Sequence, residues 1–194
     1  MLKAKKFFPL VAILLISLLA RIYYVFRIKG ISGGDFFDFL LITQELVSFN
    51  NPFISKRLPF YPLILIPGHL AGEPLIWAKI LGITFAILSL YVFFLLGKLL
   101  KINRWALYFA LATLSFQGYF FIFSLHPLTH TLFDLQVLLS LFLFYKLPAS
   151  TPAYAGGGLD TRYYILFGTL LGIASMTRLE GFIVALVLLP LLFL

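Results

Sequence analysis

The chain has 194 residues, of which 62% are hydrophobic and only 11% are charged. Soluble domains are roughly half apolar and a quarter charged, so this composition excludes an ordinary soluble protein and indicates a helical membrane protein. The absence of cysteine excludes disulfides and thiolate chemistry. The net charge of +8 does not indicate nucleic acid, because the basic residues stand at the ends of apolar runs, where membrane topology accounts for them.

Apolar runs long enough to cross a membrane follow one another along the chain. Crossing the hydrocarbon core takes about 20 apolar residues, with a range of roughly 17–25. We predict an all-α, polytopic fold with six transmembrane helices in a single membrane domain, residues 1–194. The expected spans are 7–26, 75–97, 105–125, 128–146, 162–177 and 181–194. The last run gives only about 21 Å of helix, so we expect the sequence to stop inside that span and to be a fragment.

Lysine and arginine are more frequent on one side of the predicted spans than on the other. Cytoplasmic loops carry the excess of these residues, so we predict a multi-pass protein of the cell membrane with a cytoplasmic N-terminus and a functional site on the extracytoplasmic face. The first run is too long for the apolar part of a signal peptide and is interpreted as a retained anchor. The inner set is Lys3, Lys5, Lys6, Lys98, Lys101, Arg104, Lys146 and Arg162, and the outer set is Arg27, Lys29, Lys56, Arg57 and Arg178.

The predicted external loop between the first two spans, residues 27–74, carries most of the acidic residues. After Gly33-Gly34, the segment 35–49 has helical periodicity and predicts an amphipathic helix lying at the membrane surface. An acidic stripe on about one third of its circumference is formed by Asp35, Asp38, Ile42 and Glu45.

Asp35 has two interpretations that the spacing leaves open. At the start of the amphipathic helix it would cap the N-terminus, with Asp38 near the positive end of the helix dipole. As a carboxylate beside Phe36 and Phe37 at the membrane boundary, it would act as a general base that deprotonates an acceptor. The two roles are compatible with each other.

Two cations and an aromatic residue, Lys56, Arg57 and Tyr61, follow in the second half of the loop. Such residues ordinarily anchor a protein at the membrane interface, and the two cations could also pair with a lipid phosphate on the outer face. We therefore treat all three as candidate substrate-binding residues.

The order of these features resembles a known family. A basic N-terminus precedes a span that ends in Arg-Ile-Tyr at residues 21–23, and an external aspartate precedes the amphipathic helix. The segments NPFISKRLPFYPLIL at 51–65 and MTRLEG at 176–181 follow. Over nearly the whole chain this pattern is similar to the GT-C superfamily of membrane glycosyltransferases, in particular its protein O-mannosyltransferase and aminoarabinose-transferase branch.

The resemblance implies transfer of a sugar from a polyprenyl-phosphate carrier to an acceptor on the outer face. It implies that Asp35 is the catalytic aspartate. Members often carry Asp-Glu at this point, whereas this chain has Asp35-Phe36, so Asp38 stays an alternative base. Arg178 matches the basic residue of the family's TR-x-EG segment and would hold the carrier phosphate. An ion pair between Arg178 and Glu180 that caps a loop is the alternative interpretation.

The fourth predicted span begins after Pro127 and carries His126, His130 and Asp134 at a spacing of four residues. This spacing predicts that the three share one helix face, with Asp134 inside the span, where a carboxylate normally faces a partner or a cavity. A hydrogen bond from His130 to Asp134, a role at the outer cavity and metal ligation are all open interpretations. The sequence predicts no particular cofactor, leaves a divalent metal open and commits no residue as a metal ligand.

The alternative function is a non-enzymatic membrane transporter subunit or an assembly scaffold. In that interpretation the face formed by His126, His130 and Asp134 relays protons, and Asp35 only caps a helix. The expected partners of the enzyme are the polyprenyl-phosphate-linked sugar donor and the lipid bilayer, and no nucleic acid.

Overall fold

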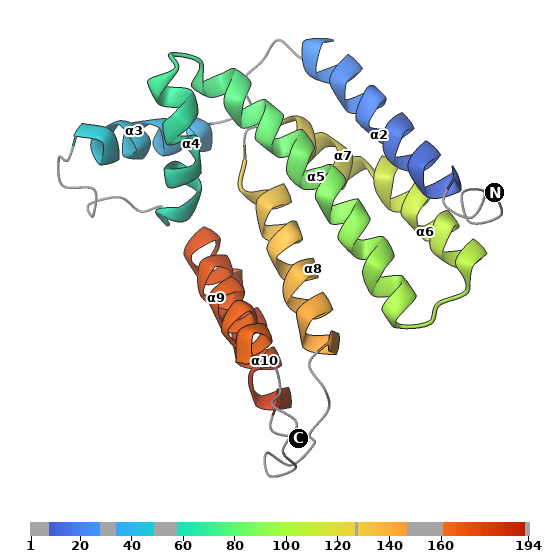
Figure 1. Ribbon diagram of the computed structural model, residues 1–194. Coiled ribbons are helices and arrows are strands. Elements are labelled where there is room, and N and C mark those ends of the chain that lie inside the picture. Colours follow the sequence, from blue (N-terminus) through green and yellow to red (C-terminus); the bar gives the residue numbers. More distant parts are fainter. Residues whose placement is uncertain (1–7, 28–33, 49–57, 127, 147–160, 193–194) are drawn as a thin grey trace.

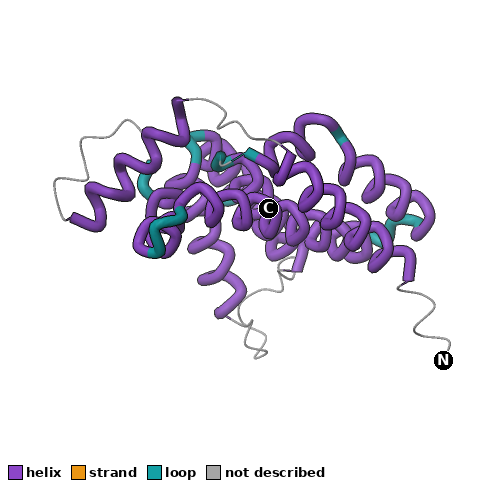
Figure 2. The backbone as a smooth tube through the Cα atoms, turned by 90° about the horizontal axis from the view of Figure 1, so that it is seen from above, coloured by secondary structure: helices purple, strands orange, loops and turns teal. Residues whose placement is uncertain are grey.

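The structure is a computed structural model that describes residues 8–27, 34–48, 58–126, 128–146 and 161–192. Within these ranges every regular element is a helix (Figure 2). The predicted all-α class is therefore confirmed for the described part of the chain. The candidate residues Lys56 and Arg57 lie outside the described residues, as do Pro127 and the loop 147–160.

The helices pack around one long central helix, α5. The elements are α2 (Phe8–Arg27), α3 (Gly34–Ser48), α4 (Phe60–Leu70), α5 (Pro74–Leu99), α6 (Arg104–Phe116), α7 (Gly118–Leu125), α8 (His130–Lys146), α9 (Thr161–Thr177), α10 (Glu180–Leu188) and a 3₁₀ turn (Pro190–Leu192). Figure 1 shows α5 running diagonally through the molecule, and α2, α4, α6, α7 and α8 all contact it. The hairpin of α9 and α10 packs on α8, and α3 and α4 form a separate pair at one end of α5.

Among the described residues, two helices are long and apolar enough to cross a membrane, α2 and α5. Their bounds agree with the first two predicted spans, 7–26 and 75–97. Large apolar side chains such as Phe8, Leu19 and Ile80 point outward from both helices, as expected of a surface that faces lipid. The described part of the chain therefore has the character of a membrane protein, whereas its orientation stays a prediction.

The third predicted span, 105–125, is not one helix. It breaks at Gln117 into α6 and α7, which are bent by 52° and can cross the membrane only as a broken pair. Gln117 adopts an extended conformation, and its side-chain oxygen accepts a hydrogen bond from the backbone N–H of Phe120 at 2.8 Å. Gln117 thus caps a new helix within an apolar run whose hydropathy alone predicts a single helix.

The predicted count of six spans is not confirmed. Two helices of the described residues pass by length and composition, or three if the bent pair α6–α7 is counted as one span. Helices α8 and α9 have 17 residues each and α10 has nine. At about 1.5 Å per residue, 17 residues give about 25 Å, short of a hydrocarbon core of about 30 Å.

The segment 27–74, predicted to be an external loop, contains two packed helices, α3 and α4, where the sequence predicts a single surface helix. Phe36 and Phe39 of α3 are buried against Tyr61 of α4, with the rings of Phe39 and Tyr61 5.1 Å apart. The predicted acidic stripe is not exposed along its whole length, because Ile42 is buried. Asp35 precedes Phe39 by four residues and so lies on the same side of α3, but it remains exposed in the first turn of the helix.

A close contact joins the two arms of the α9–α10 hairpin at Gly181. A Cβ atom built on Gly181 would lie 2.5 Å from the carbonyl oxygen of Ala174, a distance that real side chains do not reach. Gly168 and Gly172, which form a GxxxG pattern in α9, make no such close contact. A Cβ on Gly168 or Gly172 meets no atom of the described chain within 4 Å, so this pattern does not mark a close helix contact here.

We expect Gly181→Ala to lower the free energy of unfolding by about 1–3 kcal/mol, because the added methyl group overpacks the hairpin. Gly168→Ala is the matched control, and it should be neutral or stabilising by up to about 1 kcal/mol, since alanine favours the helix. Thermal unfolding of the two variants in detergent measures the difference. Equal melting temperatures would contradict the contact.

Candidate functional site

A cavity of about 420 Å³ brings together residues from segments far apart in the sequence. It lies where the start of α3, the start of α8 and the turn between α9 and α10 meet. Its described lining residues are Asp35, Phe39, Leu58, Leu128, Thr129, His130, Thr177, Arg178, Leu179 and Glu180. Four of the residues singled out in the sequence, Asp35, His130, Arg178 and Glu180, therefore line one cavity. We call it the polar cavity.

Asp35 reaches the polar cavity from the first turn of α3. The helix begins at Gly34, so Asp35 lies in its first turn, beyond the cap position that the first of its two interpretations gives it. A carboxylate there still interacts favourably with the positive end of the helix dipole. Phe36 is fully buried while Phe37 is exposed, so only one of the two flanking rings is packed into the protein.

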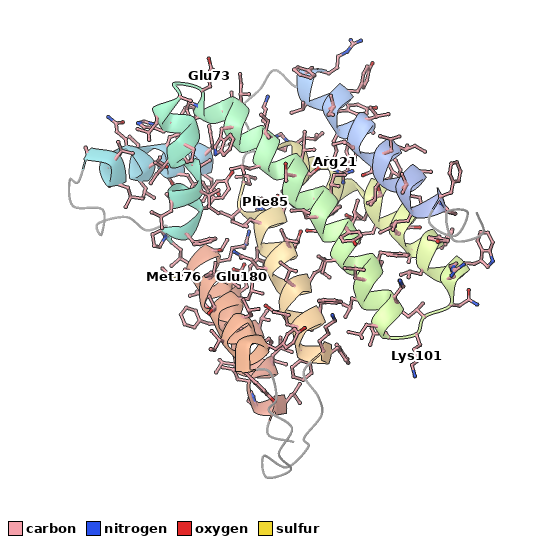
Figure 3. The ribbon with its side chains drawn as sticks, in the orientation of Figure 1. Arg21, Glu73, Phe85, Lys101, Met176 and Glu180 are labelled. Carbon is pink, nitrogen blue, oxygen red and sulfur yellow. The ribbon has the colours of Figure 1, made fainter. Side chains whose placement is uncertain are left out.

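Arg178 and Glu180 form the ion pair that the sequence offers as one interpretation. The Nη2 and Nε groups of Arg178 donate to the two carboxylate oxygens of Glu180 at 2.8 Å and 3.3 Å. The turn is held by its backbone, where the N–H of Arg178 donates to Ala174 and the N–H of Gly181 donates to Arg178, both at 3.0 Å. Figure 3 shows Glu180 at the end of the hairpin that faces α8. A guanidinium has five N–H donors, so this pair does not exhaust the capacity of Arg178.

The hydrogen bonds from Arg178 lower the pKa of Glu180 to about 2. The folded pKa lies below the ordinary value of 4.5, so the ion pair contributes stability above pH 4.5 and loses it as the pH falls through about 2. We expect the difference in melting temperature between wild type and Glu180→Gln to be constant from pH 7 to pH 5 and to shrink only below pH 4. A difference that vanishes between pH 7 and pH 5 would contradict the pairing.

A second, larger cavity of about 680 Å³ adjoins the polar cavity, because His130 and Glu180 line both. Its walls come from α6, α7, α8 and α10 and are mostly apolar, with residues such as Phe123, Val137 and Ile183. We call it the apolar cavity. Asp134 lies in its wall.

His130 stands at the junction of the two cavities. Its ring stacks on Phe123, with centroids 4.2 Å apart and planes only 6° from parallel. The charges of Arg178, Glu180 and Asp35 all act on this ring. Its Nδ1 is buried and has no hydrogen-bond partner in the described chain, so no bond to Asp134 forms through that atom.

The predicted common face of His126, His130 and Asp134 is wrong at its first member. Helix α8 begins at His130, and His126 lies before it in an extended conformation with ψ of 141°. The reason is local, since a residue that precedes a proline is restricted to extended conformations, and Pro127 follows His126. Burial, with a contribution from the positive charge of Lys79, lowers the pKa of His126 below 6.5. His126 lines neither cavity.

Two further candidates lie away from the polar cavity. Tyr61 is 1% exposed and packs in the core between α3 and α4, so it is not in position to touch a ligand there. Asp38 is exposed on α3 but is not among the lining residues. In the described ranges no cluster of three or more His, Asp or Glu side chains has the geometry to hold a metal ion.

Comparison of the chain with family models, with curated proteins and with solved structures found no match. The chemistry of the site therefore rests on its own residues.

Thr129 and Thr177 also line the polar cavity, and the sequence does not single them out. The Thr177 hydroxyl donates to the carbonyl of Ile173 at 2.9 Å, which leaves its oxygen able to accept. No motif distinguishes these threonines from the others in the sequence. The polar cavity thus has the Asp35 carboxylate on one wall and an imidazole, hydroxyl groups and the Arg178 guanidinium on the others. A second carboxylate, that of Glu180, is paired with Arg178. With N–H groups of Arg178 still available, this set is suited to an anion placed opposite a base.

Proposed function

We propose that this protein is a membrane glycosyltransferase of the GT-C type, which moves a sugar from a polyprenyl-phosphate carrier to an acceptor on the extracytoplasmic face. The observation that carries the proposal is the meeting of Asp35 with Arg178 around one cavity, although 143 positions separate them in the sequence. A base and a phosphate-binding cation are the two groups that glycosyl transfer from a lipid phosphate needs.

In the proposed reaction Asp35 accepts the proton of the acceptor hydroxyl. The acceptor oxygen then forms a bond to the anomeric carbon of the sugar, and the bond from that carbon to the phosphate oxygen breaks. The electron pair of the broken bond stays on the phosphate, which leaves as polyprenyl phosphate. Arg178 stabilises the negative charge that develops on the leaving phosphate, and a guanidinium suits this role because its planar donors match the phosphate oxygens.

Glu180 is a positioning residue in this scheme. Its two hydrogen bonds hold the Nε edge of the Arg178 guanidinium, which leaves the other N–H groups for an anion. Lys56 and Arg57 are proposed to assist with the phosphate. A divalent metal is not part of the proposed steps.

The apolar cavity supports a lipid-borne substrate in preference to a soluble one. It adjoins the polar cavity through His130 and Glu180 and has walls of aromatic and aliphatic side chains. A ligand with a phosphate in the first cavity would have apolar surface beside it for hydrocarbon. A nucleotide-activated sugar would place polar groups against these walls and leave them without hydrogen bonds, which is costly.

A photoreactive polyprenyl phosphate tests the proposal on the purified protein. We expect crosslinks in the peptides that contain residues 128–130 and 177–180, and competition by unlabelled polyprenyl phosphate but not by the polyprenol that lacks the phosphate. In liposomes, the protein should also transfer the labelled sugar from polyprenyl-phosphate mannose or a related donor to an acceptor. Equal competition by the polyprenol, or no transfer with any donor, would reject the function.

The alternative of a transporter subunit or scaffold has less support. A proton relay through His126, His130 and Asp134 needs the three groups on one face, and His126 is outside α8. Proton-coupled flux in liposomes that Asp134→Asn abolishes, in the absence of any sugar transfer, would favour it over the enzyme.

A further inference from the structure

At the opposite end of α5 from the polar cavity, three cations surround a small cavity that the proposed function does not use. It has a volume of about 290 Å³ and lies at the turn between α5 and α6. Lys98, Lys101 and Arg104 line it, with Phe94, Leu107 and Tyr108 as apolar and aromatic walls. None of the described residues that line it is acidic. We call it the basic cavity.

The backbone of this turn has a conformation that glycine normally adopts. The N–H of Ile102 donates to the carbonyl of Gly97 at 3.0 Å, and the N–H of Lys101 donates to the carbonyl of Lys98 at 3.1 Å. These two bonds make a Schellman motif at the end of α5, whose left-handed position glycine usually occupies. Lys101 occupies it instead, with φ of 57°, the only positive φ of a residue other than glycine in the described ranges. Lys101 therefore adopts this conformation at a cost that glycine would not have.

Arg104 is also placed against local preference. It is the first residue of α6, next to the positive end of the helix dipole, where a positive charge is unfavourable. The cap of this helix is supplied by Asn103, which accepts from the backbone N–H of Trp105 at 2.9 Å. Neither the motif nor the cap needs the charges of Lys101 and Arg104, so the local fold does not account for them.

The position of the basic cavity at a helix end predicts that it lies at the level of lipid headgroups. It is at the end of α5, which is long and apolar enough to cross a membrane, and at the start of the bent pair α6–α7. Trp105 beside it is 75% exposed, as is common for tryptophan at a membrane interface. Figure 3 shows Lys101 at this turn, at the far end of α5 from Glu73. Basic pockets between helices at such a level bind anionic lipid headgroups.

We propose that the basic cavity binds the phosphodiester of an anionic phospholipid, with Lys98, Lys101 and Arg104 around the phosphate and Tyr108 and Phe94 beside the glycerol. Drug-sized ligands need about 300–1,000 Å³, so the cavity is of a size for one headgroup and not for a larger ligand. This site is independent of the glycosyltransferase proposal, because the two cavities share no residue.

The test is the binding of fluorescent phosphatidylglycerol to the full chain purified in detergent, with labelled phosphatidylcholine as the zwitterionic control. We expect at least tenfold tighter binding of phosphatidylglycerol, and a loss of about fivefold in Lys101→Gly, since one cation near a lipid surface contributes that much. Because glycine suits the left-handed position, Lys101→Gly should keep or raise the melting temperature. This result separates a ligand contact from a structural role.

Lys146→Gln is the matched control, because it removes a lysine from the end of α8 that does not line the basic cavity. It should leave phosphatidylglycerol binding unchanged. An equal loss in Lys146→Gln would assign the binding to general surface charge and overturn the proposal. Equal affinity for phosphatidylcholine would do the same, as would displacement of the lipid by millimolar inorganic phosphate, which would identify a site for the free ion.

Discussion

Replacement of Asp35 by asparagine is expected to slow sugar transfer by about 10²–10⁴-fold, the range for loss of a general base. Asparagine keeps the size of the side chain but cannot accept the acceptor's proton. The donor phosphate lies at Arg178 in the proposed complex, so the KM for the donor should change little while kcat falls. The assay is transfer from a labelled polyprenyl-phosphate sugar by the full-length protein in liposomes.

Asp38→Asn is the matched control for Asp35→Asn. Both residues are exposed on α3 and carry the same charge, but only Asp35 lines the polar cavity. We expect Asp38→Asn to keep activity within a few-fold of wild type. Loss of the dipole interaction in Asp35→Asn costs at most about 1 kcal/mol of stability, so a folded, inactive variant is the predicted outcome. Undiminished transfer by Asp35→Asn would show that Asp35 is not the base. Loss of transfer only in Asp38→Asn would identify Asp38 as the base instead.

The long membrane helices could be predicted from the sequence because their signal is local. A long apolar run, broken only by Lys79 near its start and closed by Lys98, needs no tertiary information, and α5 agrees with the predicted span within two residues at either end. Helix α4 could not be predicted in the same way. Pro62 and Pro67 are signals against a helix, yet Pro62 lies in the first turn, where its missing N–H is not needed, and packing on α3 and α5 stabilises the rest.

The residues of the candidate site could be predicted from the sequence, but the packing that brings them together could not. The acids of α3 and the TRLEG segment are visible in the sequence, whereas their meeting depends on how α3 packs on α4 and how α9 packs on α8. His126 shows the opposite error, since the spacing of four residues from His130 indicates a shared face that the following proline forbids. The break at Gln117 depends on a side-chain cap of α7, which hydropathy does not detect.

Arg21 of α2 is a buried charge in a position that the sequence shows only as an interruption of an apolar run. It is 0% exposed and is held between α2, α6 and α7 (Figure 3). Its Nε donates to the Ser124 hydroxyl at 2.8 Å and its Nη2 to the carbonyl of Ser115 at 3.0 Å, and it also donates to Ser17. The Ser115 carbonyl belongs to the last turn of α6, where the break has removed its helical partner. The guanidinium also lies 4.9 Å from the ring centroid of Phe121.

We expect Arg21→Leu to lower the free energy of unfolding by about 1–6 kcal/mol. Three hydrogen bonds from a charged donor contribute about 1.5–3 kcal/mol each, and the cost of an arginine within a membrane, about 2.5–3.5 kcal/mol, offsets part of this gain. Arg27→Leu is the matched control, because Arg27 is exposed at the end of the same helix. Thermal unfolding in detergent compares the two. A melting temperature of Arg21→Leu at or above that of wild type would mean that the cost of burying the charge exceeds its bonds, and that the bend between α6 and α7 does not depend on it.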